Sequence, residues 1–179
     1  MNYQEVISFW FEEVEPKKWW VKDKSFDQEI RKRFMPIHSK AIRCELYDWR
    51  KEPLGRLAEI IVLDQFTRNI FRGSPISYAF DALALALSQE AIHTKADEGL
   101  SQNQKSFLYM PFMHSESAEI HSKAVELFSA KGLENNLEFE NSHKVIIDRF
   151  GRYPHRNAVL GRRSTEEEEE FLKQPGSSF

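Results

Sequence analysis

The sequence lacks most of the features that mark specialised classes of protein. Its single cysteine, Cys44, cannot form a disulfide within the chain, so we expect a reduced thiol on a helix and a cytoplasmic location. No apolar run approaches the roughly 20 residues of a membrane span, and the start of the chain lacks the basic and apolar regions of a signal peptide. We therefore expect no membrane partner.

A broad basic face is also missing, because the net charge is -3, and this argues against sequence-independent nucleic-acid binding. The 179 residues are 41% apolar and 30% charged, as is typical of one soluble globular domain. Fourteen Phe and four Trp supply large core-filling side chains. We predict a single domain over residues 1–174 and a disordered tail over residues 175–179.

Arginine is absent between Arg72 and Arg149, where every cation except histidine is a lysine. The arginines up to Arg56 are scattered, and the remaining ones gather in residues 64–72 and 149–163. The planar guanidinium offers a fork of donors that binds carboxylate or phosphate, whereas lysine is a flexible point charge. This segregation predicts a polar site built from two distant parts of the chain.

Nearly every long segment has the period of a helix, and no alternating strand pattern is convincing. Residues 3–14, 116–131 and 134–150 are expected to be helical, with Gly132 and Gly151 ending the last two. Helices joined by short turns form antiparallel hairpins. We predict an all-α fold.

Caps and prolines set the remaining boundaries. Ser25 with Gln28, and Ser164 with Glu167, have the spacing of capping boxes at helix starts.

Pro53 and Ser74-Pro75 are expected to open helices, with Gly73 between them as a terminator. Pro36 is expected to kink or restart its helix, and Pro111 to stop the helix that begins at Ser101.

The first polar cluster lies on one predicted helix. Asp64 and Arg68 are four residues apart and can pair, while Gln65, Asn69 and Arg72 form a neighbouring stripe at the margin of the buried face. One interpretation is an ordinary surface salt bridge. The other is a preorganised arginine pair, with Asp64 holding Arg68 in position.

Asp81 is expected inside a helix among core residues, where an unpaired carboxylate is unfavourable. It is either a structural partner for an arginine or a backbone amide, or a supporting group of a site.

The second cluster is Pro111-Phe112-Met113-His114-Ser115-Glu116, just before a predicted helix. His114 and Glu116 are candidates for a general acid–base pair, and a purely structural role for the histidine is the alternative. The spacing of His114, Glu116, His121 and His143 matches no strong zinc motif, so we predict no metal and no cofactor. His143 itself is expected at the edge of the core.

The third cluster follows Gly151, where Arg152, His155 and Arg156 emerge from an irregular segment stiffened by Pro154. Rigid display of polar side chains outside helices is common in sites. The alternative is a structural plug in which the arginines bind helix-end carbonyl groups. The sequence leaves both open.

These motifs resemble the bacterial family called domain of unknown function 924. The residues that carry the resemblance run through nearly the whole chain: Phe9-Trp10-Phe11, Trp19-Trp20, Leu63-Asp64-Gln65-Phe66-Thr67-Arg68-Asn69-Ile70-Phe71-Arg72, Phe80-Asp81, Met110 to Glu116, Phe150 to Asn157 and Leu160-Gly161-Arg162. The resemblance implies an all-α fold of the tetratricopeptide-repeat (TPR) type and no established activity. Residues 57–90 also read as one helix-turn-helix unit of that type, which predicts a solenoid-like domain of antiparallel helical hairpins.

The leading hypothesis is a polar pocket for a small anionic ligand or a peptide carboxylate, with hydrolysis or group transfer as the reaction if it is catalytic. The candidate proton-transfer residues are His114, Glu116 and His155. The candidate ligand-binding residues are Asp64, Arg68, Asn69, Arg72, Arg152 and Arg156. The alternative is a peptide-binding or scaffold module in which these motifs are structural ion pairs. Trp19 and Trp20 belong either to a homodimer surface or to the core.

Overall fold

A computed structural model describes residues 2–178, and over these residues it contains helices and turns but no strand. The predicted all-α class is thereby confirmed. Residues 1 and 179 lie outside the described residues. They are the first residue of the predicted domain and the last residue of the predicted tail. The single domain and the TPR-like packing stay predictions.

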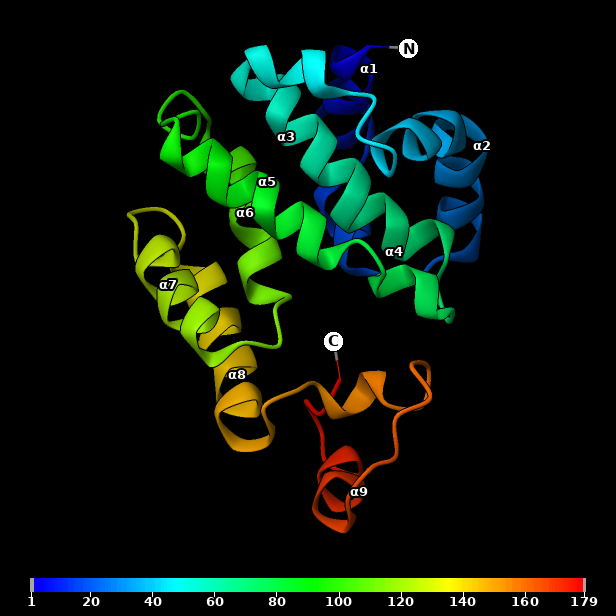
Figure 1. Ribbon diagram of the computed structural model, residues 1–179, viewed down its shortest axis with the longest axis vertical. Coiled ribbons are helices and arrows are strands. Elements are labelled where there is room, and N and C mark those ends of the chain that lie inside the picture. Colours follow the sequence, from blue (N-terminus) through cyan, green and yellow to red (C-terminus); the bar gives the residue numbers. More distant parts are fainter. Residues whose placement is uncertain (1, 179) are drawn as a thin grey trace. The chain divides into compact units, whose positions relative to one another are not determined.

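The chain forms two compact units, shown in Figure 1 and described separately. The first comprises the residues up to Arg72 together with Ile76–Pro111. The second comprises Gly73–Pro75 and the residues from Phe112 onward.

The first unit contains most of the helices. They are α1 (Tyr3–Ser8), α2 (Lys24–Ala41), α3 (Pro53–Ile61), α4 (Thr67–Ile70), α5 (Asp81–His93) and α6 (Gln102–Met113), whose last turn enters the second unit. Two π-helical turns, Phe9–Glu13 and Val62–Phe66, continue α1 and join α3 to α4. Short 3-10 turns cover Pro16–Trp20, Tyr47–Lys51 and Pro75–Tyr78.

Aromatic side chains fill the core of this unit because helix α1 packs on α3, and α2 on α4. The ring of Phe34 from α2 lies 4.7 Å from that of Phe9 and 4.8 Å from that of Phe66. Trp10 packs edge-on against Phe66 and Phe107 at 5.5 Å. All five side chains are at most 1% exposed, so this cluster stabilises the scaffold that carries the first arginine motif.

The second unit is built on a helical hairpin. Helices α7 (Ala118–Phe128) and α8 (Glu134–Phe150) lie side by side, as Figure 1 shows, and a short helix α9 (Glu166–Leu172) follows. Gly151 ends α8 with a φ of 66°, as predicted, because this left-handed conformation favours glycine. The segment between α8 and α9 is irregular apart from the 3-10 turn Pro154–Arg156.

Two predicted helix starts are wrong by one or two residues. Asp23, and not Ser25, caps α2 by accepting bonds from two backbone N–H groups. Thr165 with Glu168 forms the capping box of α9, so the predicted box of Ser164 and Glu167 is displaced by one residue. In both cases neighbouring residues of similar capping ability compete, and the chain geometry selects between them.

Two prolines do not act as predicted. Pro36 lies inside the continuous helix α2, and Pro111 lies inside α6, which runs on to Met113 instead of stopping. Cys44 is a free thiol as predicted, but its predicted helix position is wrong, since this exposed residue lies in a turn after α2 with a φ of 57°. Tertiary packing thus overrides the local preference of proline for helix ends.

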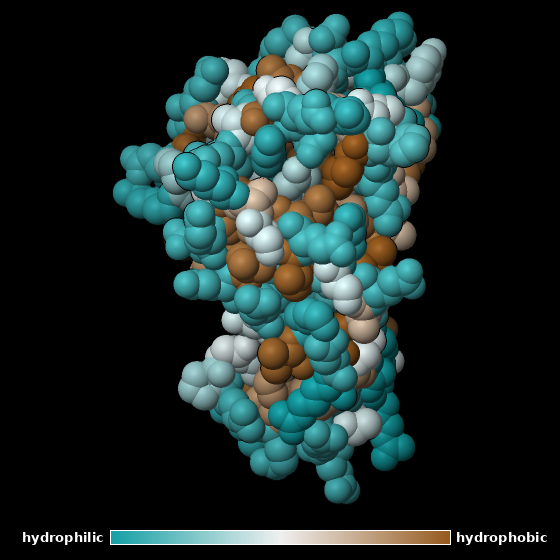
Figure 2. Space-filling view, turned by 90° about the vertical axis from the view of Figure 1, so that its left-hand side faces the viewer, coloured by the Kyte–Doolittle hydropathy of each residue, from teal (hydrophilic) through white to brown (hydrophobic). Residues whose placement is uncertain are grey.

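Some large apolar side chains remain exposed, among them Trp20, Val21, Tyr47, Ile76, Phe139 and Val145. On the face drawn in Figure 2, hydrophobic atoms form groups among hydrophilic ones. None of the helices described between residues 2 and 178 is long and apolar enough to cross a membrane.

Candidate functional site

The first arginine motif forms a buried ion-pair group within the first unit. Arg68, on α4, points its fork at Asp81, with Nη1–Oδ1 and Nη2–Oδ2 distances of 2.7 and 3.0 Å. Its Nη1 also donates to the carbonyl oxygen of Ser77. Asp64 lies one turn earlier, with Oδ1 at 3.6 Å from Nη2, and its side chain is only 1% exposed. One guanidinium is therefore shared by two carboxylates.

The position of the acidic partners explains this arrangement. Asp81 is the first residue of α5, and not an interior residue as predicted, so it faces Arg68 from a helix start. Burial by itself would lower the pKa of Arg68, but the nearby carboxylates of Asp64 and Asp81 outweigh it and raise that pKa. The guanidinium is thus held charged and firmly paired. Asp64 is fully buried and does not lie at a margin.

The neighbouring stripe pairs with α2. Arg72 donates from Nε and Nη2 to the two carboxylate oxygens of Asp27 at 2.6 and 2.8 Å. Asn69 donates to Oδ1 of the same residue at 2.8 Å. Gln65 turns inward instead and donates to Asp64 and to the sulfur of Met110. The predicted binding residues of this motif therefore make contacts that tie helices together.

Arg152 of the second unit is bound in the same manner. Its Nε and Nη2 donate to the two oxygens of Glu168 at 2.6 and 2.7 Å, and Nη2 also donates to the carbonyl of Arg163. The bonds from Arg152 lower the pKa of Glu168 to about 2. This pair fastens the irregular segment to α9.

Glu116, one of the predicted proton-transfer residues, is occupied by a fourth arginine. Arg162 donates from Nη1 and Nη2 to its oxygens at 2.6 and 2.9 Å, and the backbone N–H of Tyr153 donates at 2.8 Å. Burial raises the pKa of Glu116, but Arg162 and the Tyr153 N–H together lower it by more than burial raises it. The pKa of Glu116 is therefore below its ordinary value. An ionised, fully bonded carboxylate is a weak general acid or base.

Tyr153 is the centre of a histidine cluster. Its buried ring lies 6.2, 5.8 and 5.5 Å from the rings of His121, His143 and His155, and the guanidinium of Arg156 lies 4.5 Å from its centroid. Hence three segments far apart in the sequence meet within this unit.

The close packing of these side chains changes the pKa of His143. Burial, together with the nearby imidazoles of His114, His121 and His155, lowers the pKa of His143 to about 3. His143 is 7% exposed and its Nδ1 contacts the carbonyl of Phe139 at 2.7 Å, which confirms its predicted position at the core edge. His143 is therefore neutral near pH 7.

His121 and Glu140 form a buried pair between α7 and α8. The Nδ1–Oε1 distance is 2.6 Å, both side chains are 0% exposed, and His121 Nε2 contacts the carbonyl of Ser115 at 2.9 Å. Burial raises the pKa of Glu140. Sequence reasoning missed Glu140, although a glutamate at an inward position of a helix is a signal of such a partner.

Arg156 joins the histidine cluster to the segment before α7. Its Nη2 donates to the carbonyl of His114 at 3.0 Å, while the hydroxyl of Tyr153 donates to the carbonyl of Met113 at 2.6 Å. His114 and His155 are half-buried. Arg156 thus performs here the structural task that was one of the two predicted alternatives, the satisfaction of carbonyl groups near a helix end.

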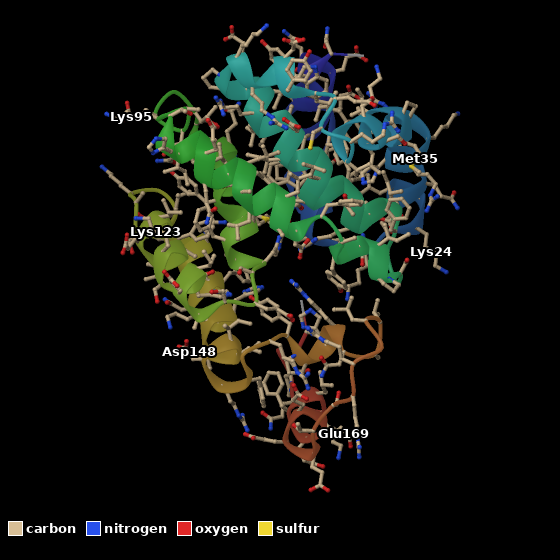
Figure 3. All side chains as sticks on the ribbon, in the orientation of Figure 1. Lys24, Met35, Lys95, Lys123, Asp148 and Glu169 are labelled. Atoms are coloured by element: carbon tan, nitrogen blue, oxygen red, sulfur yellow. The ribbon has the colours of Figure 1, made fainter. Side chains whose placement is uncertain are left out.

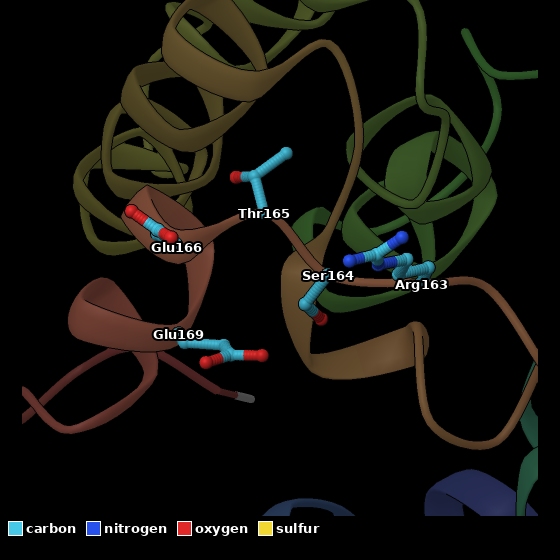
Figure 4. A pocket seen from close by; sticks show the side chains of 5 residues that line it. All are labelled: Arg163, Ser164, Thr165, Glu166 and Glu169. Carbon is cyan, nitrogen blue, oxygen red and sulfur yellow. The ribbon is translucent and has the colours of Figure 1, made fainter.

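A hollow elsewhere in the second unit, shown in Figure 4, is lined by Arg163, Ser164, Thr165, Glu166 and Glu169. None of the predicted site residues lines it. No group of three or more metal-ligating side chains with the right geometry occurs among the residues that the structure describes.

Fold and ion pairs together define an all-helical protein whose arginine motifs bind carboxylates of the same unit. A family model for a bacterial protein of unknown function, DUF924, matches residues 6–176. The chain belongs to this family.

A solved structure of similar fold is the protein of unknown function ATU0120 from Agrobacterium tumefaciens. It is 37% identical to this chain, with a TM-score of 0.91, and 96% of each chain is covered. No curated protein matches the chain significantly.

Proposed function

We propose that this chain is a cytoplasmic helical module that binds another polypeptide, and that its arginine motifs hold the fold together instead of binding a ligand. One observation carries the proposal: the forks of Arg68, Arg72, Arg152 and Arg162 each bind both oxygens of a carboxylate. A guanidinium bound in this way has one edge of two N–H donors occupied. A free anion that binds through the same edge would have to displace a carboxylate that is already in place.

If the arginine motifs bound an anionic ligand, that anion would raise the melting temperature in a saturable manner. Purified protein is heated with inorganic phosphate, sulfate and citrate, and the same series is run on Arg68→Ala, Arg152→Ala and the exposed control Arg43→Ala. Arg43 binds both oxygens of Glu45 but is 56% exposed. We expect only the gradual, non-saturating rise that such salts give to any protein. A saturable rise that Arg68→Ala or Arg152→Ala abolishes, and Arg43→Ala keeps, would contradict the proposal.

Binding of a polypeptide is tested separately. A random peptide library displayed on phage is selected on the immobilised protein, with a blank surface as control. We expect sequences enriched over the blank that bind the soluble protein when synthesised. A selection without enrichment over the blank refutes the binding module, whatever the anion series gives.

The histidine cluster supports a second candidate, a small-anion site at His114 and His155 beside Arg156. The specific observation is that His114, His121 and His155 are close enough to His143 to lower its pKa. In a catalytic version, His114 and His155 would transfer protons in a hydrolytic or transfer reaction.

Imidazole NMR resonances followed during a sulfate titration near pH 6 test this candidate. Saturable shifts confined to His114 and His155, lost in Arg156→Gln, would favour it. Shifts that remain linear in sulfate would exclude it.

A further inference from the structure

The segment 15–24 of the first unit combines exposed apolar side chains with several lysines. It contains Trp20, 61% exposed, and Val21, 55% exposed. Four exposed lysines flank them, Lys17, Lys18, Lys22 and Lys24. Against Glu15 and Asp23, these give the segment a formal charge of +2 in a chain of net charge -3. A large exposed aromatic side chain beside a net positive charge is typical of binding surfaces.

Trp20 is packed against two neighbouring aromatic rings. Pro16 opens the 3-10 turn Pro16–Trp20 and Val21 leaves it in an extended conformation. Trp19 turns inward and donates from its indole N–H to the carbonyl of Trp10 at 3.1 Å. The ring of Trp20 stands at 89° to that of Trp19 and is nearly parallel, at 8°, to that of buried Phe107. A ring packed on two neighbours in this way has less rotamer freedom to lose, which lowers the entropy cost of binding.

The nearby acidic groups are already engaged. Asp23 accepts bonds from the N–H groups of Ser25 and Phe26 and from the Ser25 hydroxyl, as the cap of α2. Glu15 pairs with Lys17 at 2.6 Å. Lys24, at the first position of α2, projects into solvent (Figure 3). Lys22 and Lys24 therefore leave a net positive charge on the segment that carries Trp20.

We infer that this basic tryptophan segment, residues 15–24, docks an acidic peptide carrying an aromatic side chain, which stacks on Trp20 while its carboxylates face the lysines. The inference rests on the proposed function, whose partner class it names. Charge complementarity selects an acidic partner, and the exposed indole selects an apolar anchor within it. A membrane fits less well, because insertion is driven by buried apolar area and Trp20 and Val21 are the large apolar side chains that this segment exposes.

The test uses a synthetic peptide of glutamates around one phenylalanine, which contains no tryptophan. Its binding to the full chain is followed by tryptophan fluorescence and by calorimetry. Control peptides carry alanine for the phenylalanine or lysine for the glutamates. We expect saturable binding of the first peptide alone, weakened by salt as expected for exposed charges.

Variants locate the site. Trp20→Ala should weaken binding about 10-fold or more, and Lys22→Glu with Lys24→Glu should weaken it comparably. Tyr47→Ala removes an aromatic of similar exposure, 64%, outside the segment and should leave binding unchanged. Melting temperatures establish whether each variant is folded. If Trp20→Ala does not fold, the double variant Lys22→Glu with Lys24→Glu tests the site instead.

The outcomes separate this inference from the proposed function. Peptides enriched from the random library that bind Trp20→Ala as well as the wild type would refute the segment as the docking surface and keep the binding module. Binding to vesicles of phosphatidylserine that requires Trp20, without binding of the acidic peptide, would also overturn the inference. Equal binding of the glutamate and lysine peptides would do the same.

Discussion

Replacing Arg68 by alanine should strongly destabilise the protein, because two carboxylates would lose their shared cation. The side chain of Asp64 is 1% exposed and cannot regain water, whereas Asp81, at 17%, partly can. Breaking a buried pair by removing one partner costs about 3–5 kcal/mol. We expect a loss of about 3–4 kcal/mol in the free energy of unfolding, since one of the two carboxylates is partly rehydrated.

Urea unfolding measures this loss as a lower midpoint at an unchanged m-value. Arg43→Ala is the matched control, because Arg43 makes the same two-bond contact in solvent and its removal should leave the urea midpoint nearly unchanged. Adding Asp81→Ala to Arg68→Ala should restore part of the loss, with a coupling of about 1–3 kcal/mol. A loss below about 1 kcal/mol for Arg68→Ala, at an unchanged m-value, would refute the structural account of the motif.

Further predictions concern pH and packing. Burial lowers the pKa of His38 to about 4 and that of His143 to about 3. The contribution of each histidine to the free energy of unfolding is therefore fully present above about pH 6.5, the ordinary pKa of a histidine. It is lost as the pH falls towards 4. The raised pKa of Glu140 changes the stability in the opposite direction, so the wild type and a variant are compared. His38→Gln should reduce the slope of the unfolding free energy against pH by about 1.4 kcal/mol per pH unit in this window. An unchanged slope would contradict the prediction. Gly55→Ala should cost about 3 kcal/mol or more, since its Cβ would lie 2.0 Å from a backbone oxygen. Gly99→Ala, where nothing lies within 4 Å, is the control, and equal urea midpoints would disprove the clash.

The helical class and most helices were predictable because the hydrophobic period and the glycine caps are local signals. Gly151 is an example, since its φ of 66° is a conformation that only glycine adopts easily. The course of α2 and α6 through Pro36 and Pro111 was not predictable in this way. Packing of a helix on its neighbours offsets the lost backbone hydrogen bond, and that packing is not visible locally.

The candidate site was predictable only in its residue types. The sequence shows Arg68 and Arg152 as forks that bind carboxylates, but not that Asp81 and Glu168 supply them, 13 and 16 residues away. Asp27 binds Arg72 across 45 residues, a distance in sequence at which no periodicity carries information. The same fork binds a structural carboxylate and a ligand equally well, so the choice between them is made by the fold.

The central claim, that the motif arginines are held by the protein itself, is tested most directly by NMR of the arginine side chains. Arg72 and Arg152 donate from Nε to Asp27 and Glu168, and Arg43 makes the equivalent bond in solvent. The account predicts that the Nε–H groups of Arg72 and Arg152 exchange with water more slowly than that of Arg43. It also predicts that their resonances stay in place when phosphate or citrate is added. Fast exchange of all three without ligand, followed by saturable shifts of Arg72 and Arg152 with an anion, would contradict it.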